Sequence, residues 1–269
     1  MSSKEDFRIG YLAVARNNHV ASVMMDRPEK LNAMTLSFWG DLRQVLDVLA
    51  DDRKTRVIII TGAGEKAFSA GGDIVGFTEL KTIEEMRAYQ IDAMSTFSHV
   101  ERSPLTVIAA VNGLAYGGGC ELALASDIVI AADTATFALP EAALGLVPGF
   151  GVLRSPDVVG RQMTKFLIAT GNTIDAHRAF EIGMVQLVVP KNELLAQAQA
   201  VAERIAARSP LALSVAKRMI NRTIDPASQD YSVEEITRLQ ASNDRAEGVE
   251  AFLARRTPVF AARQDSEPK

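Results

Sequence analysis

Three consecutive glycines open an apolar helix in the stretch Val111-Asn112-Gly113-Leu114-Ala115-Tyr116-Gly117-Gly118-Gly119-Cys120-Glu121-Leu122. Three glycines in a row cost a helix conformational entropy, so their presence requires a reason. Amide groups at a helix N-terminus lack intrahelical partners and carry a partial positive charge. We therefore expect this helix start to hold a carbonyl oxygen that gains negative charge in a transition state. Close backbone packing is the alternative reason for the glycines, and Glu121 could simply stabilise the helix N-terminus.

A second glycine turn, Ala70-Gly71-Gly72-Asp73, precedes another helical segment. Its amide groups can point at a ligand and can act together with the helix start near Gly118. An ordinary turn between a strand and a helix is the alternative. The G-x-G-x-x-A run that begins at Gly62 superficially resembles a dinucleotide fingerprint, but that fingerprint requires a helix which Gly71-Gly72 would break. We therefore expect no nicotinamide cofactor.

Glu141 is an isolated acidic residue in the otherwise apolar stretch from Phe137 to Gly149. Such a carboxylate either faces solvent or has a function. If Glu121 and Glu141 meet in one pocket, burial and mutual repulsion raise the pKa of at least one of them above the model value of about 4.3. One carboxyl can then hold a proton while the other stays ionised, as acid/base chemistry requires.

Composition restricts the class of protein. The 269 residues are 48% hydrophobic, which is enough for a large core and a smaller appendage. The apolar runs fall short of the roughly 20 residues that span a bilayer, and the N-terminus lacks the features of a secretory signal. A single cysteine, Cys120, forms no internal disulfide. We therefore expect a cytoplasmic protein without a membrane segment.

Charge and histidine placement exclude further partners. The net charge of −4 (29 − 33) comes without a basic cluster, so we expect no nucleic-acid binding. The three histidines, His19, His99 and His177, lack the spacing of metal ligands, so we expect no metal site. A G-x-S-x-G nucleophile motif is also missing from the sequence.

Hydrophobic periodicity predicts an α/β fold with a largely parallel sheet. We expect a helix that begins at Thr35 and a long helix over residues 82–102. The expected strands cover residues 8–16, 19–25, 56–61, 106–111, 126–132 and 136–139. Beyond Lys191 we expect helices only, over residues 192–208, 210–222 and 232–246. A boundary near Ser209 would divide a catalytic core, residues 1–208, from a helical C-terminal region, residues 209–269.

Four motifs together resemble the enoyl-CoA hydratase/isomerase family, also called the crotonase family. They are Asp26-Arg27-Pro28-Glu29-Lys30-Leu31-Asn32-Ala33, Phe68-Ser69-Ala70-Gly71-Gly72-Asp73, Ala110-Val111-Asn112-Gly113 with Gly117-Gly118-Gly119-Cys120-Glu121-Leu122-Ala123, and Leu139-Pro140-Glu141. The resemblance covers essentially the whole chain and reaches Glu247-Gly248-Val249-Glu250-Ala251-Phe252 and Arg256-Thr257-Pro258-Val259-Phe260. It implies a spiral of strand-strand-helix (ββα) units, a helical C-terminal trimerisation region, and assembly into a trimer or a dimer of trimers (a hexamer).

The resemblance also implies roles for individual residues. The oxyanion hole corresponds to the amides of Gly72 and Gly118. Glu121 and Glu141 correspond to the acid/base pair and have the family's separation of twenty positions (141 − 121 = 20). Glu121 is expected to help activate water and Glu141 to protonate C2 of the acyl group, with the Gly149 amide nearby. Residues from Phe77 to Phe97 are expected to line the acyl pocket.

By this resemblance coenzyme A is part of the substrate, so no separate cofactor is expected. The resemblance assigns its binding to three segments. The residues are Arg27, Lys30 and Leu31, then Ala70, Gly71, Asp73 and Ile74, and finally Phe252 and Arg255 of a neighbouring subunit.

The run after Pro148 departs from the family's usual pattern. Many hydratases carry a Gly-Gly-Thr-Gln-Arg type run there, whereas this chain reads Gly149-Phe150-Gly151-Val152-Leu153-Arg154, one residue shorter. Together with the segment from Phe137 to Ala142, this run is similar to the carnitinyl-CoA dehydratase branch.

We therefore expect an enoyl-CoA hydratase of fatty acid metabolism that acts on an acyl-CoA substrate. The alternative is a carnitinyl-CoA dehydratase-like or other 3-hydroxyacyl-CoA dehydratase. A non-catalytic acyl-CoA-binding oligomer is an alternative of another class. It would not need both Glu121 and Glu141, and isomerases often keep only one acid.

Overall fold

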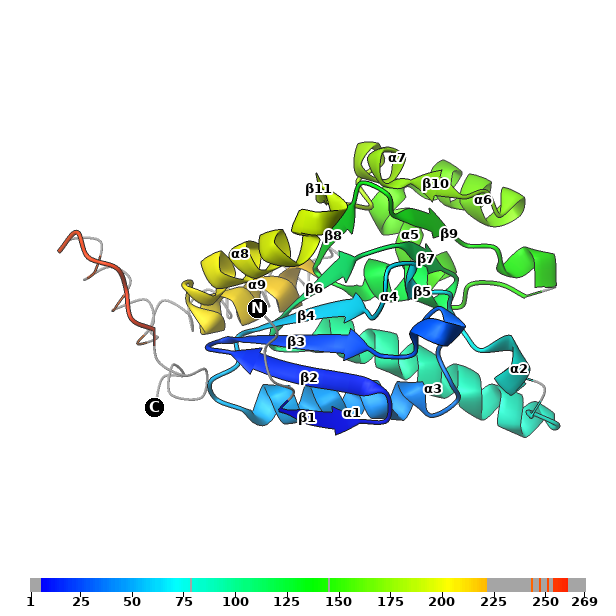
Figure 1. Ribbon diagram of the computed structural model, residues 1–269, viewed down its shortest axis with the longest axis horizontal. Coiled ribbons are helices and arrows are strands. Elements are labelled where there is room, and N and C mark those ends of the chain that lie inside the picture. The colour runs from blue at the N-terminus through cyan, green and yellow to red at the C-terminus, as the bar shows by residue number, and fades with distance from the viewer. Residues whose placement is uncertain are drawn as a thin grey trace, which may run out of the picture.

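Figure 1 shows the computed structural model of the chain. The structure describes residues 6–77, 79–144, 146–221 and 254–260, together with positions 243, 247 and 251. Among these residues, no helix combines the length and the apolar character that crossing a bilayer requires.

A seven-stranded sheet forms the centre of the molecule. Its strands in spatial order are β1 (Phe7–Ile9), β2 (Leu12–Asn17), β3 (Val20–Met25), β4 (Val57–Gly62), β6 (Thr106–Val111), β8 (Ile128–Ala132) and β11 (Leu187–Val189). The first three strands pair antiparallel, and from β3 onward every neighbouring pair is parallel. All six residues of β4 are buried, as expected for a strand covered on both faces.

A second, four-stranded sheet has the order β10 (Ile174–Asp175), β9 (Thr136–Ala138), β7 (Leu114–Tyr116) and β5 (Ala67–Ser69). Each of β4, β6 and β8 is followed along the chain by one short strand of this second sheet, and then by helices. The repeated unit is therefore strand, strand, helix, which confirms the predicted α/β spiral of ββα units.

Helices cover both faces of the large sheet. They are α1 (Phe38–Asp51), α2 (Ile74–Phe77), α3 (Ile83–Arg102), α4 (Gly118–Ala125), α5 (Gly151–Val159), α6 (Arg161–Thr170), α7 (Ala176–Glu181), α8 (Leu194–Ala206) and α9 (Pro210–Ile220), with short 3-10 helices η1 (Pro28–Lys30), η2 (Glu141–Leu144) and η3 (Lys191–Glu193). In Figure 1, α8 and α9 lie on one side of the large sheet, and α1 and α3 lie on the other. α8 packs on β3, β4, β6 and β8, which leaves the opposite side to hold the site.

The long helix α3 begins where the sequence predicts. Thr82 is its N-cap and accepts a hydrogen bond from the Glu85 amide, while the Glu85 side chain accepts one from the Thr82 amide. This reciprocal capping box satisfies two amides that the helix leaves without partners. It fixes the residue at which α3 begins, and thereby which side chains of α3 face the core.

Two expectations near the N-terminus are wrong. Residues 8–16 are not one strand, because Gly10, with φ of +55°, turns the chain between β1 and β2. The first helix begins at Phe38 rather than at Thr35, and its N-cap is Ser37. The periodicity of Phe38, Leu42 and Val45 is correct, but Thr35 belongs to the preceding turn.

Four short strands of the structure were not predicted from the sequence. β5, β7, β10 and β11 have only two or three residues each, so none shows a period of its own. Pairing with strands from distant parts of the chain is what makes them strands.

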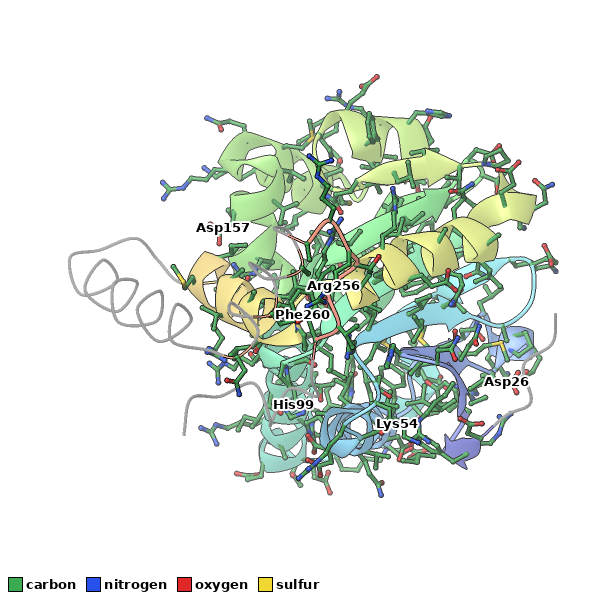
Figure 2. All side chains as sticks on the ribbon, turned by 90° about the vertical axis from the view of Figure 1, so that its left-hand side faces the viewer. Asp26, Lys54, His99, Asp157, Arg256 and Phe260 are labelled. Carbon is green, nitrogen blue, oxygen red and sulfur yellow. The ribbon has the colours of Figure 1, made fainter. Side chains whose placement is uncertain are left out.

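The described C-terminal residues pack on the core. Arg56 donates to the carbonyl oxygen of Ala206 at 2.9 Å and to that of Phe260 at 2.8 Å, so segment 254–260 lies beside the end of α8 (Figure 2). The predicted helix over residues 232–246 lies outside the described residues, apart from position 243. Trimerisation through this region, and the boundary at Ser209, stay predictions.

A buried lysine joins α9 to the core. The Lys217 side chain is 9% exposed, and its ammonium donates to the carbonyl oxygens of Val100 and Leu105 and to Asp127 Oδ2, at 3.0, 3.1 and 2.7 Å. Burial lowers the pKa of Lys217 and raises that of Asp127, because each charge has left water. The two charges therefore depend on each other.

Removing one partner of this pair should destabilise the protein. We expect Lys217→Met to lower the free energy of unfolding by about 3–5 kcal/mol, because Asp127 is left buried and unpaired. The double variant Lys217→Met/Asp127→Asn should recover part of that loss. Urea unfolding followed by the fluorescence of Trp39, the single tryptophan, measures both values. A Lys217→Met protein as stable as the wild type would contradict the assignment.

Candidate active site

The two glycine turns lie against each other. The Met34 amide donates to Gly71 O, and the Asp73 amide donates to Met34 O, both at 2.8 Å, which fixes the first turn beside the segment before α1. Gly71 has φ of +89°, and a Cβ built on it would lie 2.7 Å from Tyr116 O and 3.0 Å from Gly118 N. Only glycine permits this approach.

The approach brings the predicted amide donors together. A Cβ built on Gly118 would lie 3.6 Å from Gly72 N, so these two residues are neighbours although they come from different ββα units. Gly118 is the first residue of α4, whose opening amides have no partner within the helix. The structure thus places Gly72 and Gly118 side by side at a helix N-terminus, which is the geometry an oxyanion hole needs.

Glu121 lies in the first turn of α4 and is only 7% exposed. Its Oε1 accepts hydrogen bonds from the amides of Phe150 and Gly151, both at 2.8 Å, where α5 begins. Burial raises the pKa of Glu121, and the two N–H groups oppose that rise. The ionised form therefore has two dedicated donors at a positive helix end.

Glu141 has a different environment at the start of η2. Burial raises its pKa to about 7, and the nearby charge of Glu121 contributes to the rise. Oε1 lies against Gly117, because a Cβ there would be 2.9 Å from it, and within the described structure the buried Oε2 has no hydrogen-bond partner. Burial therefore favours the protonated form of this carboxyl group, against one hydrogen bond from the backbone amide of Glu141 itself.

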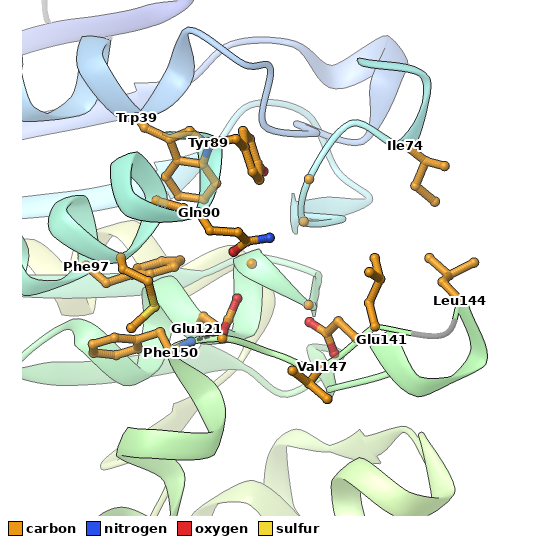
Figure 3. Close-up of a pocket in the computed structure, with 18 of the residues that line it drawn as sticks. Trp39, Ile74, Tyr89, Gln90, Phe97, Glu121, Glu141, Leu144, Val147 and Phe150 are labelled. Carbon is orange, nitrogen blue, oxygen red and sulfur yellow. Dashed lines mark hydrogen bonds between the residues drawn. The ribbon is translucent and has the colours of Figure 1, made fainter. Parts of the chain in front are cut away.

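Both carboxylates face one cavity of about 160 Å³, shown in Figure 3. The predicted glycines Gly71, Gly72, Gly118 and Gly149 line it, together with Ala70 and Ile74. Other lining residues come from α1, α3 and the segment around η2. They are Trp39, Tyr89, Gln90, Ala93, Met94, Phe97, Gly117, Pro140, Leu144, Leu146, Val147 and Phe150.

Part of this lining was predicted from the sequence. Tyr89, Gln90, Ala93, Met94 and Phe97 fall within the range predicted to line the acyl pocket. Their spacing is that of one helix face, a signal that could have ordered them. Trp39 and Phe150 were missed, because Trp39 lies in a different unit and Phe150 in the irregular run after Pro148. Neither position has a sequence signal that separates it from an ordinary core residue.

The residues assigned to coenzyme A lie partly at this cavity and partly behind it. Arg27 pairs with Asp73 at 2.7 Å, and the Ala70 amide donates to Leu31 O at 3.0 Å, so the two segments pack on each other. Lys30 is exposed beside them. Ala70, Gly71 and Ile74 reach the cavity, whereas Arg27, Lys30 and Leu31 do not line it.

The remaining two assigned positions are at the C-terminus. Arg255 is exposed and has φ of +53°, and Phe252 lies outside the described residues. Their proposed contact with a neighbouring subunit stays a prediction.

Cys120, His19 and His99 do not line the cavity. Cys120 is 1% exposed, and burial raises the pKa of its thiol, so it is not a nucleophile. His19 contacts Lys54 O, and His99 pairs with Asp47 at 2.7 Å, both away from the cavity.

Comparison with known proteins gives consistent matches over almost the whole chain. The family model described as enoyl-CoA hydratase/isomerase matches residues 15–263. A short-chain-enoyl-CoA hydratase of Clostridium acetobutylicum is 38% identical, over 90% of this chain and 94% of the relative. A carnitinyl-CoA dehydratase of Escherichia coli O157:H7 is 37% identical, over 94% and 98%. The crystal structure of an enoyl-CoA hydratase from Bacillus anthracis has a TM-score of 0.87 and 36% identity, over 94% and 100%.

A side chain at position 117 should displace the carboxyl group of Glu141. Gly117 and Gly160 both have positive φ, +51° and +80°, but a Cβ at Gly160 would meet nothing within 4 Å. We expect Gly160→Ala to cost about 1–2 kcal/mol of stability through backbone strain alone, and Gly117→Ala to cost about 0.5–1 kcal/mol more, because the flexible end of Glu141 must move away from the methyl group. Denaturant unfolding of the two variants measures the difference. Equal losses would mean that Glu141 does not lie against Gly117.

The raised pKa of Glu141 predicts a pH-dependent effect on stability. Folding raises this pKa above its unfolded value, so the folded state binds more protons and loses stability as pH rises from about 4.3 to about 7. Glu141→Gln cannot ionise and avoids this loss. We expect it to be more stable than the wild type at pH 8 by about 1–2 kcal/mol, after allowance for solvent screening, and equal to it at pH 4. Unfolding curves at both pH values test this, and a difference that is the same at both would contradict it.

Proposed function

Because the chain belongs to the enoyl-CoA hydratase/isomerase family, we propose that it catalyses the reversible addition of water across the 2,3 double bond of a 2-enoyl-CoA thioester. The observation that carries the proposal is the pair Glu121 and Glu141, which line one cavity beside the amides of Gly72 and Gly118. Hydration needs a base for water, an acid for C2 and a site for the thioester oxygen. These four residues can supply all three.

The thioester oxygen would accept hydrogen bonds from the Gly72 and Gly118 amides. Attack at C3 moves electron density onto this oxygen, and fixed donors in a water-poor cavity stabilise that charge. The partial positive charge at the start of α4 acts in the same direction. Backbone amides need no rotamer search, so the donors are in place before the substrate arrives.

The two carboxyl groups would divide the proton transfers. Glu121, whose ionised form has two amide donors, takes a proton from the water as its oxygen bonds to C3. Glu141, with a pKa raised to about 7, gives its proton to C2. The product is a 3-hydroxyacyl-CoA, and return of the proton from Glu121 to Glu141 restores the starting state. The reverse sequence removes water.

Two alternative functions remain: one differs from this proposal in its substrate, and the other is a different class of protein. A carnitinyl-CoA dehydratase-like activity would use the same carboxyl groups on a substrate with a different tail, and the 37% identical relative with that name supports keeping it in the assay. A non-catalytic acyl-CoA-binding oligomer would not need Glu121 and Glu141 in contrasting environments. Assembly into a trimer or a dimer of trimers, and contact of coenzyme A with Arg27, Lys30 and Asp73, remain part of the proposal.

Replacing either acid should abolish most of the activity. We expect Glu121→Gln and Glu141→Gln each to lower the turnover of crotonyl-CoA by at least about 100-fold, the usual scale for a positioned acid or base, while acyl-CoA still binds. The loss of absorbance of the 2,3 double bond measures turnover, and calorimetry measures binding. Glu181→Gln on α7 is a matched control, because Glu181 is an exposed acid paired with Arg178 outside the cavity. Full activity in either test variant would exclude the two-carboxylate mechanism.

A further inference from the structure

One end of the cavity is closed by a wall of aromatic rings, Trp39, Phe97 and Phe150. The rings of Trp39 and Phe97 meet edge to face with centroids 5.2 Å apart, and those of Phe97 and Phe150 are 4.9 Å apart. Tyr89 adds a fourth ring, 6.0 Å from Trp39. Such distances are those of rings in contact. The three wall residues are only 2–4% exposed, so their rings are almost completely covered by neighbouring atoms.

The wall lies on the inner side of the catalytic groups. Figure 3 shows Phe97 and Phe150 on one side of Glu121, and Ile74, Leu144 and Val147 on the opposite side. The latter three are 56%, 56% and 66% exposed, so they mark the mouth. A thioester held between mouth and wall, with its coenzyme A part toward solvent, directs its acyl tail at the rings.

The helices that carry the wall are tied together. Arg43 of α1 pairs with Asp92 of α3 and also donates to the Asp92 carbonyl oxygen at 2.9 Å. Thr96 Oγ1 of α3 donates to the carbonyl oxygen of Trp39 at 3.2 Å. These contacts hold the ring of Trp39 against that of Phe97.

A second connection fixes the other half of the wall. Arg154 of α5 donates to Glu101 of α3 at 2.9 Å. Phe97 and Phe150 lie near these two positions, on α3 and at the start of α5, so the same contact joins the elements that carry both rings.

We propose that Trp39, Phe97 and Phe150 limit the length of the acyl chain, so that this protein acts on short, unbranched acyl-CoA thioesters. This inference rests on the proposed hydratase function and names its substrate class. The cavity of about 160 Å³ is smaller than the roughly 300–1,000 Å³ of pockets for larger ligands. Each methylene that reaches the wall would have to displace one of these rings from its contact with the next ring, which costs free energy.

The ring packing also bears on the nature of the tail. Aromatic rings can bind a quaternary ammonium group, but only through exposed ring faces. Here Trp39 and Phe97 meet edge to face, so one of the two rings presents its face to the other ring and not to the cavity. The wall is therefore suited to the end of an alkyl tail.

A chain-length series tests the proposal. The kcat/KM of the wild type would be measured with crotonyl-CoA, 2-octenoyl-CoA, 2-dodecenoyl-CoA and crotonobetainyl-CoA. In parallel, calorimetry would give Kd for the saturated butyryl-, octanoyl- and dodecanoyl-CoA. We expect kcat/KM to fall at least about 10-fold from crotonyl-CoA to octenoyl-CoA, the scale on which a pocket discriminates tails that do not fit. Kd should rise along the saturated series.

Two matched variants assign the effect to the wall. Phe97→Leu removes a ring that lines the cavity, whereas Phe38→Leu removes an equally buried ring that touches Trp39 but does not line it. We expect Phe97→Leu to raise the ratio of octenoyl-CoA to crotonyl-CoA kcat/KM about 10-fold, and Phe38→Leu to leave it unchanged. If Phe97→Leu does not fold, Met94→Ala, which shortens a partly buried lining residue, replaces it.

The outcomes separate this inference from the proposed function. Equal kcat/KM for crotonyl-CoA and dodecenoyl-CoA, equal shifts in both variants, or a preference for crotonobetainyl-CoA would each overturn the wall as a limit for alkyl tails. Failure to hydrate any enoyl-CoA, with the saturated series still ranked by length, would refute the hydratase proposal and leave the wall supported. Failure to bind any acyl-CoA would refute both.

Discussion

The site depends on one close approach of two backbone segments. Residues 69–72 and residues 116–119 touch without intervening side chains: a Cβ on Gly119 would lie 2.3 Å from Ser69 O, and one on Gly71 would lie 2.7 Å from Tyr116 O. The pairing of β5 with β7 holds the segments in this register. A side chain at Gly71 or Gly119 would push the two turns apart, and the amides of Gly72 and Gly118 would no longer lie together. The contact between the two backbone segments therefore determines where the groups of the site lie.

The same approach sets the environment of the two acids. Because Gly118 begins α4, Glu121 is carried into the cavity within the first turn, where the start of α5 supplies two amide donors. Glu141 comes from the next ββα unit and contacts Gly117 without comparable donors. Burial raises the pKa of both acids, but two amide donors oppose the rise at Glu121, whereas at Glu141 the nearby charge of Glu121 adds to it.

Regions farther from the chemistry contribute through packing. Asn32 is fully buried and donates to the carbonyl oxygens of Ala63 and Ala67, at 2.9 and 2.8 Å, which attaches the loop before α1 to the segment that leads into β5. On the other side of the cavity, α1 and α3 are joined by the contacts of Arg43. The two glycine turns therefore lie between two segments that are each joined to the core by side-chain hydrogen bonds. This preorganisation limits the cost of ordering the site when a substrate binds.

The sequence drew attention to both acids and both glycine turns, and the family resemblance of its motifs implied the ββα spiral. These features are local: Gly117-Gly118-Gly119 and Glu121 occupy one helix start, and the strong periodicity of α3 needs no partner to be recognised. Tertiary structure alone decided which acid receives two amide donors, because the donors to Glu121 come from residues 150 and 151. It also decided that Trp39, Phe97 and Phe150 form one wall, since ring contacts across three helices leave no pattern along the chain. Short strands such as β5 and β7 were invisible for the same physical reason: pairing between distant segments, and not propensity within three residues, makes them strands.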